Sequence, residues 1–388
     1  MKLSAVLLGS SFRRFVHSVP LLLVLIICSA PRVSISADTQ DVTADAAPHS
    51  YHTIANASTG KDDLSRQYAK ALALYDEGHI HEAITAQAAV VSQLETLQGQ
   101  HNPQAANVRA FLKEMEQVAR LSSEEKQKYQ RARLSLVSGV EQIRLEDYRK
   151  ARSILEPALE TFATLLGDDC VTSAGTLEQI GIATIRDHLP EVAKNYFVRA
   201  TAARRATVGP NHPDMANALY LLGSSCLDAR QYAEGETYLR EALSIDRKHC
   251  AMGSSRYAAM LERMAQAMLG QQRTLEAEAF CLQAISITEQ NNAQKSLPAA
   301  GFLSTLAEIH VQYGEFEVAE AHLSQSLQLH ERLLSARSPQ MINLWERRAQ
   351  LAEKLHRPEE AKTFQSRANE IRKQHDTAQF PTSKSGNY

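Results

Sequence analysis

The chain has 388 residues, of which 44% are hydrophobic, 6% aromatic and 22% charged. Its formal net charge is −2 at pH 7 and no stretch forms a basic stripe, which argues against nucleic acid as a partner. Few aromatic residues and the lack of any alternating strand pattern favour stacked helices over a sandwich or barrel, so we expect an all-α fold.

The N-terminus has the pattern of an export signal. Arg13 and Arg14 precede the apolar run Val19–Cys28, and small residues end at Ala37. The run is shorter than the roughly 20 residues that a membrane span requires. We therefore predict a signal peptide over residues 1–37, with an uncleaved N-terminal membrane anchor as the alternative. The expected location is the periplasm or the exterior of a bacterial cell.

A polar segment follows the predicted signal. Residues 38–63 contain few large apolar side chains and no helical period, so we expect a disordered linker. Loss of residues 1–37 removes four basic residues and no acidic one, which leaves 38 basic and 44 acidic residues. The four remaining cysteines follow neither a metal-ligand nor a disulfide spacing. We expect buried structural thiols at these positions, which are Cys170, Cys226, Cys250 and Cys281.

Residues 64–121 form an irregular N-terminal part. Apolar spacing predicts a helix pair over residues 64–97 and an additional helix over residues 103–121. Ser122 is followed by acidic residues up to Glu125. A hydroxyl cap with acids in the first turn predicts that the next helix begins here.

A spacing of 42 residues then organises residues 122–372. Only glycine and alanine occupy two columns at this spacing, Gly139, Gly181, Gly223, Ala265, Ala307 and Ala349, and Ala151, Ala193, Gly235, Ala277, Ala319 and Ala361. Where two helices cross closely, a side chain larger than a methyl group holds the backbones apart. A further column marks the start of each second helix, at Tyr148, Pro190, Tyr232, Thr274, Phe316 and Pro358. We therefore predict six tandem helix pairs.

Position for position, these columns resemble the tetratricopeptide repeat (TPR). The 42-residue spacing and the turn Gly209–Asp214 resemble the kinesin-light-chain variety of that repeat. The resemblance covers roughly residues 64–372 and implies a right-handed α-solenoid of seven stacked antiparallel helix pairs, a TPR-like superhelix. Its first helices would line a concave groove suited to a peptide or a partner helix. We expect a disordered tail over residues 373–388.

Two local details test the register. In the turn Gly209–Asp214 we expect His212 to hydrogen-bond the turn and Asp214 to cap the next helix. Pro157 falls inside a predicted second helix, where we expect a kink or an early break.

The sequence contains no catalytic, metal-binding or phosphate-binding motif with supporting spacing. We therefore expect a protein that is not an enzyme and that holds neither a cofactor nor a metal. An enzyme with an unrecognised site is a remaining alternative, for which turnover dependent on His212 or His310 would be the test.

The repeat register predicts which residues line the groove. They are Arg133, Glu178, Tyr220, Ser224, Glu262, Gln266, Ser304, Glu308, Glu346 and Gln350. Peptide-binding TPR proteins often carry asparagines two or three places before the small residue of the first helix, but Glu178 and Gln179 hold these places here. The acidic bias instead predicts a basic or amphipathic partner segment, and a merely solvated helix face is the alternative reading.

The expected function is a non-catalytic protein–protein interaction scaffold of the bacterial envelope or exterior, which binds a partner segment in the TPR groove. A structural or assembly component of an envelope complex, docking through its outer faces, is the alternative. We expect a protein or peptide partner, no nucleic acid, and no transmembrane span after signal cleavage.

Overall fold

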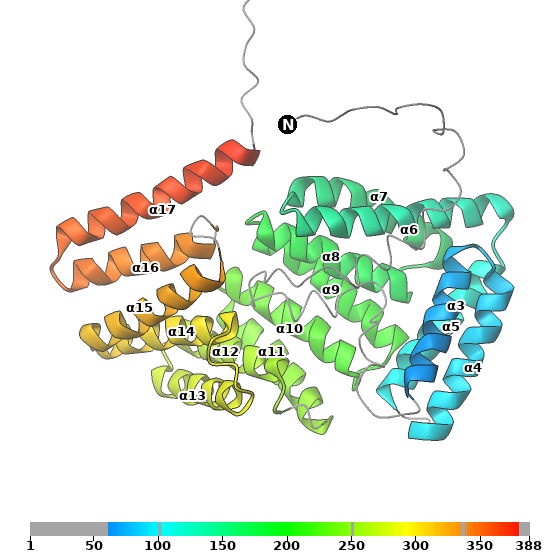
Figure 1. The fold of residues 1–388 in the computed structure, drawn as a ribbon, viewed down its shortest axis with the longest axis horizontal. Helices are drawn as coiled ribbons and strands as arrows, with labels where there is room; N and C mark the ends of the chain where they lie inside the picture. Colours follow the sequence, from blue (N-terminus) through cyan, green and yellow to red (C-terminus); the bar gives the residue numbers. More distant parts are fainter. Residues whose placement is uncertain (1–60, 100–101, 250–251, 335–337, 339, 380–388) are drawn as a thin grey trace, which may run out of the picture.

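The computed structural model describes residues 61–99, 102–249, 252–334, 338 and 340–379, and this part of the chain is all-helical (Figure 1). The predicted signal peptide, nearly all of the predicted linker, Cys250 and the end of the predicted tail lie outside the described residues. Among the described helices, none is long and apolar enough to cross a membrane.

The described helices form seven adjacent pairs and one additional helix. The first pair is α3 (Lys61–Asp76) with α4 (Ile80–Gln98), and α5 (Pro103–Ala119) follows it. We call the six later pairs the regular units: α6 (Ser123–Arg144) with α7 (Tyr148–Leu166), α8 (Val171–Arg186) with α9 (Pro190–Thr207), α10 (Pro213–Asp228) with α11 (Tyr232–Lys248), α12 (Ser255–Gly270) with α13 (Thr274–Gln290), α14 (Leu297–Tyr313) with α15 (Phe316–Leu333), and α16 (Gln340–Lys354) with α17 (Pro358–Gln379). The units stack in chain order, with α3 to α5 at one end and α16 with α17 at the other (Figure 1). This arrangement is the predicted α-solenoid of stacked helix pairs.

The helix boundaries agree closely with the 42-residue spacing. Each second helix of a regular unit begins at the residue that the spacing indicates, from Tyr148 of α7 to Pro358 of α17. Ser122 caps α6 in a capping box with Glu125. Two details differ: α7 continues through Pro157 to its end at Leu166, and α17 continues past residue 372.

Close approach of the two helices in a unit explains the small-residue columns. A methyl group added at Gly181 would lie 2.6 Å from the ring of Phe197, and one added at Gly139 would lie 2.5 Å from Leu155. Phe197 and Leu155 are themselves fully buried. In the unit of α12 and α13, Ala265 replaces the glycine. The residue facing it in the register is Cys281, whose side chain is smaller than those of Leu155 and Phe197 at the same position.

The turn between the two helices of every regular unit contains a residue with positive φ. Glu146, His188, Arg230, Gln272, Gly314 and His356 adopt φ between 57° and 79° and recur at the 42-residue spacing. Only Gly314 is free of the steric cost that a Cβ atom brings in this region. The backbone N–H of the following residue bonds back into the first helix, as from Arg273 to the Met268 carbonyl at 2.9 Å. The stack therefore imposes one turn geometry on residues that do not favour it.

Three of the four expected thiols can be placed. Cys170, Cys226 and Cys281 are buried and free, as predicted. Burial raises the pKa of Cys170 to about 12 and that of Cys226 to about 11, so both stay protonated at neutral pH.

We predict that Gly181→Ala lowers the free energy of unfolding by about 1–3 kcal/mol, because the added methyl overlaps the Phe197 ring. Urea unfolding followed by circular dichroism measures this. Phe197→Leu in the same chain is expected to recover part of the loss. Gly253→Ala is the matched control, since an added methyl there meets nothing within 4 Å. Equal effects at positions 181 and 253 would contradict close packing as the reason for the columns.

We also predict that Gln272→Gly raises the free energy of unfolding by about 1 kcal/mol, and that Gly314→Ala lowers it by a similar amount. Both positions occupy the same place in the turn, with φ of 61° and 79°. Thermal and urea unfolding of the two variants beside the parent are the measurements. A loss of stability in Gln272→Gly would show that the glutamine side chain outweighs the strain of its backbone.

Candidate partner-binding face

We call the side of the stack formed by the first helices of the later units, α8, α10, α12, α14 and α16, the first-helix face. Nine of the ten predicted groove residues lie at two register positions on these helices, three residues before and one residue after the small residue. The exception is Arg133, on α6. Its guanidinium group lies 2.6 Å from Asp76 and stacks over the Tyr75 ring at 4.8 Å, so it joins α6 to α3.

Glu178 is 1% exposed and is held by a buried ion pair. Arg204 of α9 donates two hydrogen bonds to its carboxylate, both of 2.8 Å. Burial lowers the pKa of Arg204, but the charge and hydrogen bonds of Glu178 raise it by more, so that the guanidinium stays charged. Glu178 therefore belongs to the interior of its unit.

The same 26-residue spacing pairs Arg372 of α17 with Glu346 of α16. This second pair is exposed, with the two side chains 46% and 28% accessible. In the unit of α10 and α11 the corresponding positions hold Tyr220 and Asp246. Asp246 is fully buried and pairs instead with Arg256 of α12, at 2.6 Å and 3.1 Å. Burial raises the pKa of Asp246 and the charge of Arg256 opposes that shift.

The remaining polar residues contact one another within a helix and across neighbouring units. Glu262 accepts hydrogen bonds from Thr305 at 3.3 Å and from Gln266 at 3.4 Å. Arg347 of α16 donates a hydrogen bond of 2.6 Å to Ser304 of α14 and lies 2.7 Å from the Glu308 carboxylate. Arginines thus neutralise Glu178, Glu308 and Glu346. Three of the four glutamates among the predicted groove residues thus have an arginine partner within the chain.

The first-helix face is closed over α8 and α10. Every residue from Val171 to Thr184 and from Met215 to Leu227 is buried. Five predicted groove residues, on these two helices and on α12 and α14, are at most 6% exposed, namely Glu178, Tyr220, Ser224, Glu262 and Ser304. Arg133, Gln266, Glu308 and Glu346 are partly exposed, and Gln350 is exposed. Five of the ten predicted residues are thus buried in this structure. Their role in partner binding stays a prediction.

Two polar atoms on α10 stand apart from these networks. Asn217 Oδ1 and Ser224 Oγ are buried, and within the described part of the chain no hydrogen-bond partner reaches either atom. Both residues lie on the stripe that contains Tyr220, because positions 217, 220 and 224 follow the helical period. Sequence reasoning identified Tyr220 and Ser224 but missed Asn217, one turn earlier. Extending the stripe backwards along the helix would have found it.

The turn before α10 is held by His212, which is the N-cap residue of that helix. Its Nδ1 accepts the backbone N–H of Asp214 at 3.0 Å, so Nε2 carries the hydrogen and donates it to the Pro103 carbonyl at 2.8 Å. The expected turn hydrogen bond is confirmed, whereas the expected cap at Asp214 is wrong, since Asp214 lies in the first turn. Burial lowers the pKa of His212, and the charge of Asp214 opposes that shift. His212 therefore has a structural role.

No group of three or more histidine, cysteine or acidic residues that could hold a metal occurs among the described residues. His310 Nδ1 contacts Glu315 at 2.7 Å, and its ring stacks on that of His322 with centroids 5.2 Å apart. This contact joins α14 to α15.

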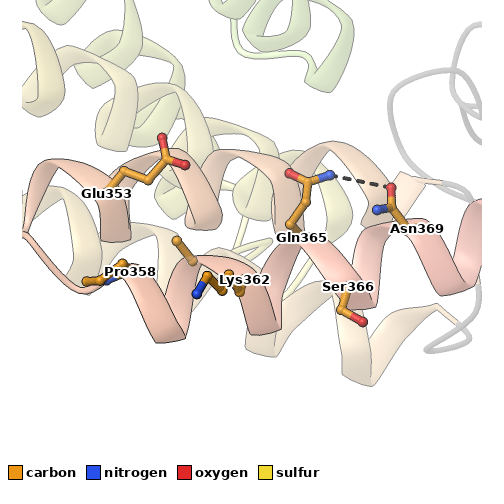
Figure 2. A pocket seen from close by; sticks show the side chains of 7 residues that line it. Glu353, Pro358, Lys362, Gln365, Ser366 and Asn369 are labelled. Carbon is orange, nitrogen blue, oxygen red and sulfur yellow. Dashed lines mark hydrogen bonds between the residues drawn. The ribbon is translucent and has the colours of Figure 1, made fainter.

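A polar depression lies between α16 and α17, at the end of the stack (Figure 2). Its lining residues are Glu353, Pro358, Ala361, Lys362, Gln365, Ser366 and Asn369. Gln365 donates a hydrogen bond of 3.4 Å to Asn369 within α17. The side chains drawn in Figure 2 come from one exposed helix pair and do not converge on a common point, so this depression is solvated surface rather than a binding site.

Comparison with known proteins supports the fold. The tetratricopeptide repeat family matches residues 172–248, which cover α8 to α11. No curated protein sequence matches the chain. The apo form of RapI is similar in structure with a TM-score of 0.53 and 13% identity, covering 81% of this chain and 99% of that one. Aspartyl phosphate phosphatase F from Bacillus subtilis has a TM-score of 0.50 and 10% identity, covering 82% and 96% of the two chains.

The nearly identical TPR-like repeats of a kinesin-light-chain type protein from Podosopora anserina have a TM-score of 0.42 and 16% identity, covering 54% of this chain and 96% of that one. At these identities the likeness of the solved structures concerns the fold alone. A repeat of the TPR type is therefore established for α8 to α11, within an all-helical stack.

We predict that Arg204→Met lowers the free energy of unfolding by about 3–5 kcal/mol, because it leaves the Glu178 carboxylate buried without its partner. The matched control is Arg372→Met, which removes the exposed pair at the same spacing and should cost less than about 1 kcal/mol. Combining Glu178→Met with Arg204→Met should recover most of the loss. Urea unfolding of the parent, the two single arginine variants and the double variant measures these differences in the free energy of unfolding. Equal losses from the two arginine replacements would show that burial does not distinguish the pairs.

Proposed function

We propose that the chain is a non-catalytic protein-interaction scaffold that binds a segment of a partner protein on the first-helix face, centred on α10. The observation that carries the proposal is the pair of buried atoms without hydrogen-bond partners, Asn217 Oδ1 and Ser224 Oγ. Buried polar groups without partners are rare in native proteins because each costs about 1–3 kcal/mol. Other atoms of this kind among the described residues occur singly on other helices, whereas α10 has two on one stripe. This pairing is explained if a ligand supplies the missing hydrogen bonds.

The chemistry of this stripe indicates what it would recognise. Asn217 Oδ1 is an acceptor, and the Ser224 hydroxyl both donates and accepts. Tyr220 and Leu221 lie between them, are also buried, and would supply aromatic and aliphatic contacts once the face opens. A partner segment with backbone or side-chain donors and apolar side chains fits this set. Because Glu178 and Glu308 already pair with arginines, strong positive charge on the partner is not required.

The closure of the face over α10 has a consequence for binding. Asn217 and Ser224 are 7% and 6% exposed, so a partner reaches their polar atoms only after the side chains around them move. We infer that binding is accompanied by local opening of the first-helix face. The repeat architecture permits this, since each unit contacts only its neighbours and adjacent units can shift relative to one another.

We propose export as the cellular context. The support is the basic and apolar pattern of residues 1–37, which resembles a cleaved signal peptide. The scaffold would then act in the bacterial envelope or outside the cell. An assembly component that docks through its second helices is the rival. Two leucines on α13 are exposed, Leu275 by 77% and Leu282 by 51%. They are the reason to test docking through the second helices beside the proposed site on α10.

We predict that Asn217→Leu combined with Ser224→Ala abolishes partner capture without lowering the free energy of unfolding. Removing polar atoms that have no partner relieves a desolvation cost, so stability should stay equal or rise by up to about 1–3 kcal/mol. The measurement is capture from an envelope extract on the immobilised intact chain, with captured proteins identified by mass spectrometry and unfolding followed in parallel.

The control is Ser225→Ala, because that neighbouring hydroxyl already donates a hydrogen bond of 2.8 Å to the Leu222 carbonyl. This variant should keep the partner. A second variant, Leu275→Asp with Leu282→Asp, tests docking through α13. Capture that survives the α10 substitutions but is lost from the α13 variant would contradict the proposed site and support the rival.

A further inference from the structure

One face of α6 is exposed along the length of the helix and carries an apolar centre. Leu134 is 70% exposed, Val137 45% and Leu145, which caps the helix, 64%. Their spacing places them along one side of the helix, away from the buried residues Ala132 and Leu136. Large apolar side chains this exposed, gathered on a single helix, commonly mark an interaction surface.

Comparison along the repeat shows that this exposure is exceptional. The residues at the position of Leu134 in the five later units are at most 5% exposed, and they are Thr176, Ala218, Met260, Phe302 and Leu344. The position therefore faces a neighbouring helix wherever the stack continues. In the first regular unit, no helix of the described chain covers it. Leu134 and Val137 form an open edge of the stack.

The additional helix explains why the edge is open. The first pair touches α6 near its N-terminal half, where Tyr75 meets Tyr129 and Asp76 meets Arg133. Helix α5 runs instead towards the starts of α8 and α10. There, Glu114 accepts the backbone N–H of Thr172 at 3.0 Å. The chain therefore leaves the C-terminal half of α6 without the preceding unit that covers the same position elsewhere (Figure 1).

We propose that α6 packs against α6 of a second copy of this chain, antiparallel and across a two-fold axis at the level of Leu136. Charge complementarity indicates this occupant. Arg131 lies one turn before Leu134, and Glu141 lies one turn after Val137. In the antiparallel pair Arg131 of each copy faces Glu141 of the other, while the four Leu134 and Val137 side chains meet at the centre. Two-fold symmetry repeats both charge contacts.

The size of the surface sets the strength of this dimer. Helix α6 has 22 residues and is therefore about 33 Å long. A single helix pair buries less than the roughly 1,200–2,000 Å² that is typical of stable complexes, so the dissociation constant should lie in the micromolar range or above. Both charged groups already make contacts within α6 that the dimer would exchange: exposed Arg131 donates a hydrogen bond of 3.3 Å to the Gln127 carbonyl, and Glu141 lies 3.5 Å from Arg144.

The test is sedimentation velocity of the intact chain over a concentration series from about 1 to 500 µM, which brackets that range. We expect a reversible monomer–dimer equilibrium, and Leu134→Glu should weaken it at least about tenfold. Leu275→Glu is the matched control, since that leucine is 77% exposed on α13 and should leave the equilibrium unchanged. A monomer throughout, or a dimer insensitive to Leu134→Glu, would overturn the proposal.

A charge-swap experiment tests the antiparallel geometry. Arg131→Glu and Glu141→Arg should each weaken self-association, because each places like charges opposite one another twice. Mixing the two variants should restore a dimer that contains one copy of each, since every charge contact in the mixed pair is then attractive. Failure of the mixture to dimerise more tightly than either variant alone would overturn the two-fold pairing of α6. Circular dichroism of each variant confirms that the fold is retained.

Discussion

The structure depends on the close approach of the two helices in each unit. Glycine or alanine at the crossing lets the backbones come together, and the residue opposite fills the space that remains. The glycines face Leu155, Phe197 and Leu239, and added methyl groups would lie 2.5–2.9 Å from these side chains. This contact fixes the angle within a unit, and the same angle repeated six times produces the stack. The positive-φ turn residues, the helix starts and the positions of the buried side chains all follow from it.

The spacing of residues along the sequence predicts much of this architecture. The remainder depends on side-chain contacts, which spacing does not predict. The small columns predicted the helix pairs, and Pro190 and Pro358 marked the first residues of α9 and α17. The positive φ of the turn residues could not be predicted from the sequence. Glycine at these positions would have indicated it, but Glu146, His188 and Arg230 occupy them. The register identified Glu178 as a face residue. Its partner Arg204 could not be predicted, because periodicity gives the face of a helix but not the direction of a long side chain.

Because of the additional helix, the two ends of the stack have different surfaces: one has the open apolar edge of α6, and the other the polar surface of α17. Through Glu114 and the Pro103 carbonyl, α5 is tied to the starts of α8 and α10 by hydrogen bonds of 3.0 Å and 2.8 Å. It stabilises the middle of the stack and leaves the edge of α6 open. At the other end α17 presents a polar outer surface, as a terminal repeat must to remain soluble. Partner binding on α10 and self-association through α6 would use different surfaces of the same stack.

A partner that completes the hydrogen bonding of α10 is the central element of the proposed function. The most direct measurement is an experimental structure of the chain bound to a captured partner. We expect a partner donor within hydrogen-bond distance of Asn217 Oδ1 and a partner polar atom at the same range from Ser224 Oγ, with neighbouring first helices displaced around them. A partner seated on the second helices, with both atoms still buried and without hydrogen bonds, would contradict it.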